Sequence, residues 1–253
     1  MLDREIALHF RDQLRDARAT ALKDAEAFEQ VVFVLERIGV YVTGSIDNLA
    51  TYADTLAREA SKSPLADSIP SALPDWHAPF STLYALVRRA RNDALHEGAY
   101  ARHLTVHAVE LSLILEDALM TDAFSARDFM VTNPLCAYLW QPMSSVRRSM
   151  LVNSFSFLPV AVGPSESPQW RLLSDFSLAA YLRTAQGPTD RNRRLARKLS
   201  DVVNENLVTL IDAPECGPED AVTTVLERSQ GRPVLVLGPE RDLRGIVTPF
   251  DVL

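Results

Sequence analysis

The sequence predicts an α+β fold, in which an N-terminal antiparallel helical bundle precedes an α/β region. Three observations support this prediction. Apolar residues recur at helical spacing through residues 1–121. After residue 122 the pattern changes to short apolar runs bounded by Pro, Gly, Ser and Asp, with helical stretches between them. The second half of the chain also repeats its own pattern, which is typical of two similar units that share an interface.

The 253-residue chain is 47% hydrophobic and 23% charged, an ordinary composition for a folded protein. Its formal net charge of -7 argues against non-specific coating of nucleic acid, although a local basic site remains compatible with it. Cys136 and Cys216 lie far apart without metal-ligand spacing, which is typical of reduced thiols. There is no apolar signal core, and no stretch approaches the ~18 apolar residues of a membrane helix. We therefore expect a soluble, cytoplasmic protein without a membrane partner.

The helical half, residues 1–122, contains four periodic stretches. One helix is expected to end near Gly44, and a second follows it directly. Residues 62–78 contain three prolines, which predict a loop. Further helices are predicted at 80–97 and at about 102–121, and the last is apolar around most of its circumference, as in the centre of a bundle. Short connections favour antiparallel neighbours, so the sequence predicts a four-helix bundle.

The second half, residues 127–253, contains two units of the same order: a proline, a helix, a polar turn, an apolar strand, a turn and a second apolar strand. The strands match by short peptides: Pro159-Val160 with Pro233-Val234, and Leu172-Leu173-Ser174 with Ile246-Val247-Thr248. We therefore place repeat one at about 127–187, a linker helix at 188–204 and repeat two at about 205–253.

Repeat two ends in "GIVTPFD", with a glycine, two apolar residues, a threonine and then an aspartate three residues later. Together with the helix spacing and the Pro-Val strand, this pattern resembles the CBS domain, whose tandem pairs form Bateman modules. The resemblance covers 127–253 and implies regulatory binding of an adenine nucleotide (AMP, ADP or ATP) at Gly245, Thr248 and Asp251. It implies that the aspartate accepts hydrogen bonds from both ribose hydroxyls, while the threonine hydroxyl and the helix start face phosphate.

Repeat one departs from this signature. Arg171 stands at the glycine position, Ser177 replaces the aspartate, and only the hydroxyl is retained, at Ser174. We count Ser174 among the nucleotide-binding residues but expect one good site, in repeat two. The chain stops at Leu253, where a last CBS helix should begin, so we expect this helix to be absent or replaced. In the alternative interpretation, Asp251 simply caps the end of its strand in a ligand-free pair.

The stretch "RRARNDALHEG", residues 88–98, places Arg91 and Asn92 shortly before His96. This resembles the motif of HEPN domains, small helical bundles whose paired motifs form a metal-independent ribonuclease site in a dimer. The resemblance assigns proton transfer to His96, charge stabilisation on the phosphorane to Arg91, and orientation of phosphate or of His96 to Asn92. The alternative is a polar patch that stabilises the bundle or a dimer.

Two further clusters carry weaker signals. His103, His107 and Glu110 share one helix face at metal-ligand spacing, but no other helix supplies a matching set, so we predict no metal site. The densest basic run predicts a solvated linker helix or, alternatively, a strip that contacts phosphate or RNA; it comprises Arg191, Arg193, Arg194, Arg197 and Lys198.

These patterns predict a homodimeric, metal-independent ribonuclease, a toxin or defence-like effector that an adenine nucleotide regulates through the CBS pair. Its substrate would be RNA, its catalysis would need no cofactor, and nothing indicates DNA specifically. The alternative is a catalytically silent CBS nucleotide sensor whose bundle serves dimerisation or partner binding. A third interpretation is a purely structural interaction protein.

Overall fold

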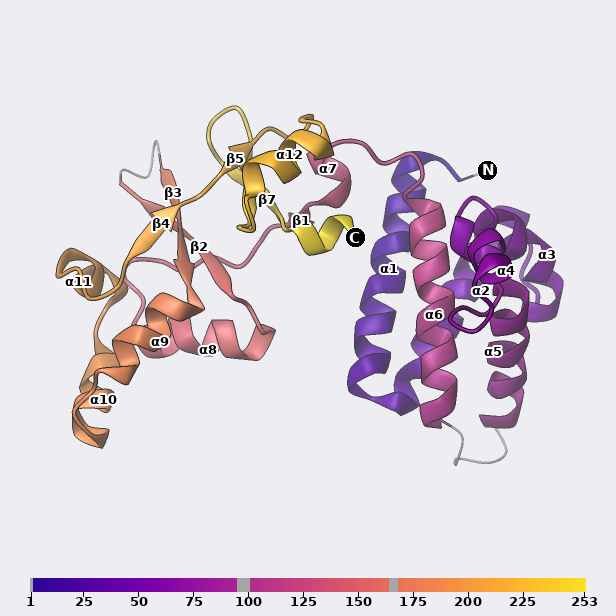
Figure 1. The fold of residues 1–253 in the computed structure, drawn as a ribbon, viewed down its shortest axis with the longest axis horizontal. Helices are drawn as coiled ribbons and strands as arrows, with labels where there is room; N and C mark the ends of the chain where they lie inside the picture. Colours follow the sequence, from indigo (N-terminus) through magenta and orange to yellow (C-terminus); the bar gives the residue numbers. More distant parts are fainter. Residues whose placement is uncertain (1, 95–100, 164–167) are drawn as a thin grey trace. The chain divides into compact units, whose positions relative to one another are not determined.

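The computed structural model describes residues 2–94, 101–163 and 168–253 (Figure 1). The chain forms two compact units, residues 1–123 and 124–253, and each has its own hydrophobic core. The first is a helical bundle and the second an α/β unit, so the predicted α+β fold class is confirmed. Within the described residues, no helix is long and apolar enough to cross a membrane.

The described part of the bundle has five helices of twelve or more residues, one more than predicted: α1 (Arg4–Lys23), α2 (Glu29–Thr43), α3 (Leu49–Ala60), α5 (Phe80–Ala94) and α6 (Ala101–Leu119). The 3₁₀ turn η1 (Ala25–Phe28) joins α1 to α2. The predicted loop at 62–78 contains a 3₁₀ turn, η2 (Pro64–Ala66), and a short helix, α4 (Ser68–Ala72).

The unpredicted helix α1 begins at a side-chain cap, because the Asp3 carboxylate accepts the Ile6 N–H at 2.9 Å. Its buried apolar stripe is narrow and consists of Phe10, Leu14, Ala17 and Ala21. Charged residues surround this stripe, so the periodic signal is weak although the spacing is helical.

The predicted helix end at Gly44 is confirmed. Gly44 has the left-handed φ of 69° and donates its N–H to the Val40 carbonyl. Five residues earlier, Gly39 allows α3 to approach α2 closely. A Cβ at Gly39 would lie 2.4 Å from the Tyr52 ring, and that ring is fully buried. The absence of a side chain at Gly39 therefore sets the packing distance between the two helices.

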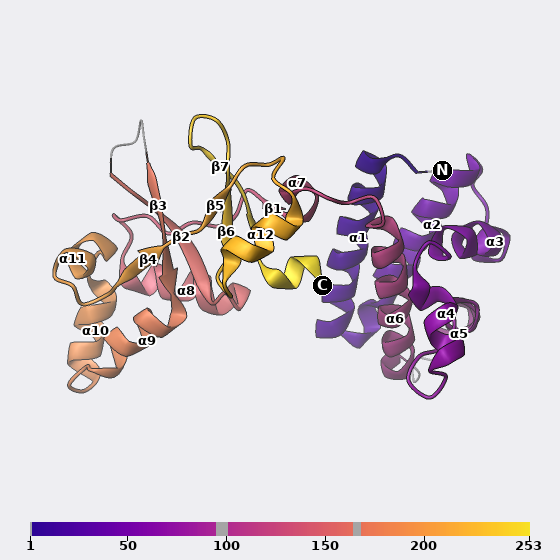
Figure 2. The same ribbon diagram turned by 45° about the horizontal axis from the view of Figure 1, so that its top comes forward.

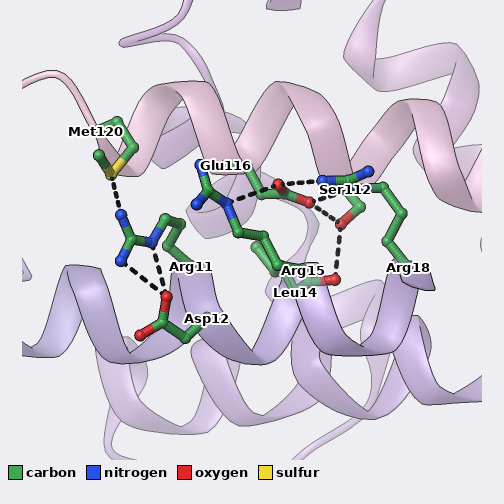
Figure 3. Close-up of polar contacts among 8 residues, drawn as sticks. All are labelled: Arg11, Asp12, Leu14, Arg15, Arg18, Ser112, Glu116 and Met120. Carbon is green, nitrogen blue, oxygen red and sulfur yellow. Dashed lines mark hydrogen bonds and ion pairs between the residues drawn. The ribbon is translucent and has the colours of Figure 1, made fainter. Parts of the chain in front are cut away.

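Helices α1 and α6 lie side by side (Figures 1 and 2) and share a polar cluster (Figure 3). The Glu116 carboxylate accepts two hydrogen bonds from Arg18 at 2.9 Å each, and a third from the Ser112 hydroxyl at 2.9 Å. Arg15 lies 3.5 Å from the same carboxylate. Glu116 is only 6% exposed, so these hydrogen bonds compensate for its loss of hydration.

The second unit begins with α7 (Ala126–Phe129) and β1 (Val131–Thr132). Repeat one continues with α8 (Met143–Asn153), β2 (Phe157–Val162), β3 (Gln169–Ser174) and α9 (Asp175–Arg183). Then come α10 (Pro188–Ala196) and α11 (Leu199–Asn204). Repeat two contains β4 (Leu210–Asp212), β5 (Glu215–Cys216), α12 (Val222–Ser229), β6 (Val234–Leu237), β7 (Leu243–Val247) and the 3₁₀ turn η3 (Pro249–Val252).

The two repeats exchange strands. One sheet has the order β2-β3-β4 and the other β1-β7-β6-β5. Strand β1 precedes the first hairpin but pairs with β7 of repeat two, whereas β4 precedes the second hairpin but pairs with β3 of repeat one. Because each repeat completes the sheet of the other, the two fold as a single unit around a shared core of Leu172, Leu235 and Leu237.

The strand registers correct the predicted alignment of the Pro-Val peptides. Leu158 pairs with Leu173 in repeat one, and Val234 pairs with Val247 in repeat two. Val234 therefore corresponds to Leu158, two positions before the Val160 that the peptides suggested. A shift of two keeps every side chain on the same face of the sheet, so the apolar pattern does not reveal it.

Two other predicted segments differ in detail. The run 133–140, one of the short apolar runs after residue 122 whose pattern is typical of a strand, contributes only a bridge between Ala137 and Val160 in the described residues. The predicted linker helix at 188–204 is divided into α10 and α11. The break lies at Arg197, whose backbone is extended and whose carbonyl accepts the Met143 N–H at 2.8 Å.

Candidate functional site

The predicted nucleotide residues Thr248 and Asp251 lie together where β7 ends and η3 begins. The Thr248 N–H and hydroxyl each donate to Oδ2 of Asp251 at 2.7 Å. The Asp251 N–H donates back to the Thr248 carbonyl at 3.0 Å. These hydrogen bonds form a capping box. Such a box is what the alternative interpretation expects, in which Asp251 caps the end of its strand without binding a ligand.

A second capping box in the same unit provides an internal comparison. Asp128 accepts hydrogen bonds from the Phe124 and Ser125 N–H groups at 2.9 Å and from the Ser125 hydroxyl at 3.0 Å. Asp128 is fully buried, whereas Asp251 is half-buried and its neighbour Phe250 is 75% exposed. The same local arrangement therefore holds one carboxylate in the core and the other, half-buried, in a turn that also carries an exposed aromatic residue.

Gly245, the third predicted nucleotide residue of repeat two, has a structural role. It lies in β7 opposite Thr132 of β1. A Cβ at this position would meet three side-chain atoms of Met130 at 2.6–2.9 Å. The strand exchange thus accounts for this glycine without a ligand, because Met130 occupies the space that a larger residue would need.

In repeat one, the corresponding residues form contacts within α9 and with residues of repeat two. The Ser174 hydroxyl caps α9 by accepting the Ser177 N–H at 3.1 Å. The Ser177 hydroxyl donates to the Thr209 carbonyl at 3.2 Å and accepts the Thr209 N–H at 3.0 Å. Arg171, at the glycine position, forms an ion pair with Asp212 across β3 and β4. Both hydroxyls thus take part in hydrogen bonds within the chain.

The predicted ribonuclease residues fall only partly within the described structure. Arg91 lies in α5, and its Nη2 forms an ion pair with Oε1 of Glu36 on α2 at 2.7 Å. Asn92 also belongs to α5, although its side chain lies outside the described part of the chain, and so does the whole of His96. The Arg91 guanidinium is therefore paired within its own bundle.

Tyr84, about two helical turns before Arg91, was not predicted as a site residue. Its hydroxyl is buried and donates to the Leu49 carbonyl at 2.6 Å. Burial raises the pKa of Tyr84 well above its ordinary value, the charge of Arg88 opposes this shift, and that of Glu36 adds to it. Because the hydroxyl keeps its proton, it acts as a structural donor that fixes α5 against the start of α3.

The predicted basic run is not a uniformly solvated surface. The guanidinium of Arg194 lies 5.3 Å from the centre of the Tyr181 ring, and its Nε donates to Oδ2 of Asp190 at 3.0 Å. A hydrogen bond from the Gln186 N–H, together with Arg194, lowers the pKa of Asp190. Arg197 forms an ion pair with Glu205 at 2.5 Å. These arginines fasten α10 to its neighbours, a role that their spacing did not predict.

Among the described side chains, no group of three or more His, Cys, Asp or Glu residues is placed to hold a metal ion. His107 and Glu110 lie on α6 as predicted, whereas the side chain of His103 is outside the described part.

The sequence matches no family model and no curated protein. In structure, the chain is similar to a CBS domain-containing protein of unknown function from Bacillus anthracis, with a TM-score of 0.41 and 14% identity over 51% of this chain and 90% of that one. It is also similar to CBSX2 in complex with AMP (TM-score 0.38, 16% identity, 51% and 93%). A further similarity is to CbpB in complex with c-di-AMP (TM-score 0.37, 14% identity, 49% and 78%).

Proposed function

We propose that residues 124–253 form a CBS pair that binds an adenine nucleotide, and that the protein is a nucleotide sensor rather than a ribonuclease. The carboxylate of Asp251 accepts hydrogen bonds from the ribose hydroxyls of this nucleotide. The supporting observation is the capping box, in which Thr248 orients the half-buried Asp251 carboxylate one position after the exposed Phe250. A fixed carboxylate suits the two hydroxyls of a ribose, and an exposed aromatic residue in the same turn suits a ligand that also carries a base.

The two repeats differ in a way that favours a single site. Ser177 stands where repeat two has Asp251, and its hydroxyl is bonded to the Thr209 backbone. A carboxylate accepts a pair of hydroxyl donors more strongly than a neutral hydroxyl does. Repeat two is therefore the half that binds, and repeat one completes its sheet through β1.

In this proposal the helical bundle has no ribonuclease activity. The ion pair between Arg91 and Glu36 occupies the guanidinium that the ribonuclease mechanism needs for the phosphorane. In a sensor the same pair simply joins α5 to α2. Dimerisation or partner binding is then the role that we propose for the bundle.

Calorimetry with AMP, ADP and ATP tests the nucleotide site. The wild type should bind at least one of them, and Asp251→Ala should weaken binding about tenfold to a hundredfold, because a charge-assisted hydrogen bond contributes ~1.5–3 kcal/mol. Asp251→Asn should keep the cap and the melting temperature but lose most of the affinity. The matched control is Ser177→Ala in repeat one, which should bind as the wild type does.

The proposal fails if none of the three nucleotides binds, or if Asp251→Asn binds as tightly as the wild type. In the second case the carboxylate would serve only the capping box. Equal losses in Asp251→Asn and Ser177→Ala would instead point to a general effect on folding, which the melting temperatures of the two variants would reveal.

A further inference from the structure

A pocket of about 610 Å³ lies in repeat one, lined by residues of α8, α9 and α10. These three helices lie together beside the sheet of β2 and β3 (Figures 1 and 2). The volume falls within the range of roughly 300–1,000 Å³ that is typical of small-molecule sites. Because its lining comes from repeat one and from α10, the pocket shares no residue with the Thr248 and Asp251 site and does not depend on the proposed function.

The floor of the pocket is apolar. Met150 of α8 and Leu178 and Leu182 of α9 line it and are at most 7% exposed. Two large apolar side chains at its edge remain accessible: Leu151 is 60% exposed and Phe155 is 39% exposed. Single exposed apolar residues are common on protein surfaces, but these two line one hollow above a buried apolar floor.

Three arginines line the same pocket: Arg147 from α8, Arg183 from the last turn of α9 and Arg191 from α10. In the described part of the chain, none of these side chains takes part in an ion pair or a hydrogen bond. Arg194 and Arg197, which follow on the same basic run, are paired with Asp190 and Glu205. The run is thus divided between arginines that hold the fold and one, Arg191, that faces the pocket.

The polar groups are distributed unevenly along the pocket. The Asp175 N–H donates to the Ser156 carbonyl at 2.9 Å, so α9 starts beside the end of α8. Asp175 and Ser154 line this end. Arg147 lies seven residues before Ser154 on α8, and Arg183 lies eight residues after Asp175 on α9, in each case about 10–12 Å along the helix at 1.5 Å per residue. The pocket therefore has an acidic end and, well separated from it, a basic end.

We propose that this pocket binds an anionic amphiphile, a small molecule with a carboxylate or phosphate head and an unbranched apolar chain. The head lies at the basic end, where guanidinium groups form paired hydrogen bonds with oxyanions. The chain lies on the floor formed by Met150, Leu178 and Leu182, and Leu151 covers it from the edge. Asp175 at the far end repels a second anion, which favours a ligand with one charged head.

Calorimetry on the full-length protein, below the micellar concentration of each probe, tests the ligand class. Decanoate or decyl phosphate should bind, and lengthening the chain by two methylenes should strengthen binding about tenfold. Decyltrimethylammonium, which has the same chain and the opposite charge, should bind at least tenfold more weakly. Inorganic phosphate alone should bind far more weakly than decyl phosphate, because it lacks the chain.

Matched variants locate the binding. Arg147→Ala should weaken decanoate binding about tenfold or more, whereas Arg148→Ala removes an exposed arginine of the same helix outside the pocket and should leave it unchanged. Leu151→Gln should reduce the dependence on chain length. Asp251→Ala should bind decanoate as the wild type does, so failure of the nucleotide site does not affect this test.

Any of the following binding results would overturn the proposal: no binding of either anionic probe, equal binding of the cationic probe, or equal losses in Arg147→Ala and Arg148→Ala. Light scattering measures the oligomeric state and so tests another possible occupant of this pocket, a second copy of the chain. If Leu151→Gln converts a dimer to a monomer, the hollow is a protein interface and the ligand proposal is wrong.

Discussion

At the scale of single residues, Gly245 shows how a binding motif and a packing constraint share one position. The sequence assigns this glycine to nucleotide binding, whereas the structure places the Met130 side chain where a Cβ would be. Ser174 behaves similarly, since its hydroxyl caps α9. In both cases the motif marks the correct strand end, and the side-chain partners come from contacts that the motif does not contain.

We predict that Gly245→Ala destabilises the second unit by about 1–3 kcal/mol, because the new methyl group overpacks against Met130. Urea unfolding measures this cost. Met130→Ala in the same chain should remove the clash, so the double variant should be less destabilised than the sum of the two single variants. Gly217→Ala is the control, since a Cβ there meets its nearest neighbour at an ordinary 3.7 Å. Strict additivity would contradict this explanation of Gly245.

The two thiols give a prediction with a defined pH dependence. Burial raises the pKa of Cys136 and of Cys216 to about 11, and the nearby Asp220 adds to the shift at Cys216. Because only the thiolate reacts, alkylation of the folded protein near pH 7.5 should be about a hundredfold slower than that of an ordinary thiol. The rate should rise about tenfold per pH unit until the pKa is reached. Fast labelling of the native protein at neutral pH would contradict these shifts.

At the scale of elements, the polar cluster between α1 and α6 fixes the register of two long helices. The hydrogen bond with Glu116 is the main cause that raises the pKa of Arg18, ahead of the opposing effect of burial. The Glu116 carboxylate is buried, whereas Arg15 and Arg18 are partly exposed. A buried charge is costly unless it is paired and hydrogen-bonded, so the stability of this cluster depends on the donors around Glu116.

Glu116→Ala should therefore lower the free energy of unfolding of the bundle by about 2–3 kcal/mol, because it removes the acceptor of both Arg18 hydrogen bonds and leaves Ser112 with the longer contact to the Leu14 carbonyl at 3.4 Å. Denaturant unfolding followed by circular dichroism measures the change. Glu110→Ala, on an exposed position of the same helix, should change stability by no more than about 0.5 kcal/mol. Equal effects of the two substitutions would show that the cluster adds nothing specific.

Helices and strands whose sequence signals are local could be predicted, and those without such signals could not. The C-terminal end of α2 and the two hairpins of the second unit were predicted from the sequence, because glycine at a helix end and alternating apolar runs are local features. Strands β1 and β5 were missed, since two residues carry no alternation. The ion pair of Arg91 with Glu36 joins residues that are far apart in the chain, and no periodic pattern marks such a pair.

At the scale of the whole molecule, the ribonuclease hypothesis and the proposed sensor differ in one assay. Because Arg91 is paired with Glu36, we expect the wild type to leave single-stranded RNA intact in EDTA, with and without nucleotide. Gel analysis of a broad RNA panel measures this. Cleavage that His96→Ala abolishes, with the fold retained, would contradict the sensor and support the ribonuclease. Cleavage that persists in His96→Ala would indicate a contaminant.

The division into two units gives the last prediction. Each unit has a separate core, and the start of the second is bound to its own repeat two, since the Phe124 carbonyl accepts the Val222 N–H at 2.9 Å. Fragments 1–123 and 124–253 should therefore fold independently, each with a cooperative thermal transition.

A nucleotide that binds only the native second unit stabilises it by mass action, by about 2.7 kcal/mol at a hundred times its Kd. AMP, ADP or ATP should thus raise the melting temperature of 124–253 and leave that of 1–123 unchanged. The Asp251→Asn variant of the second fragment should lose most of this shift. An equal shift in fragment 1–123 would place the nucleotide in the bundle, and failure of 124–253 to fold would show that its exchanged strands need the bundle for stability.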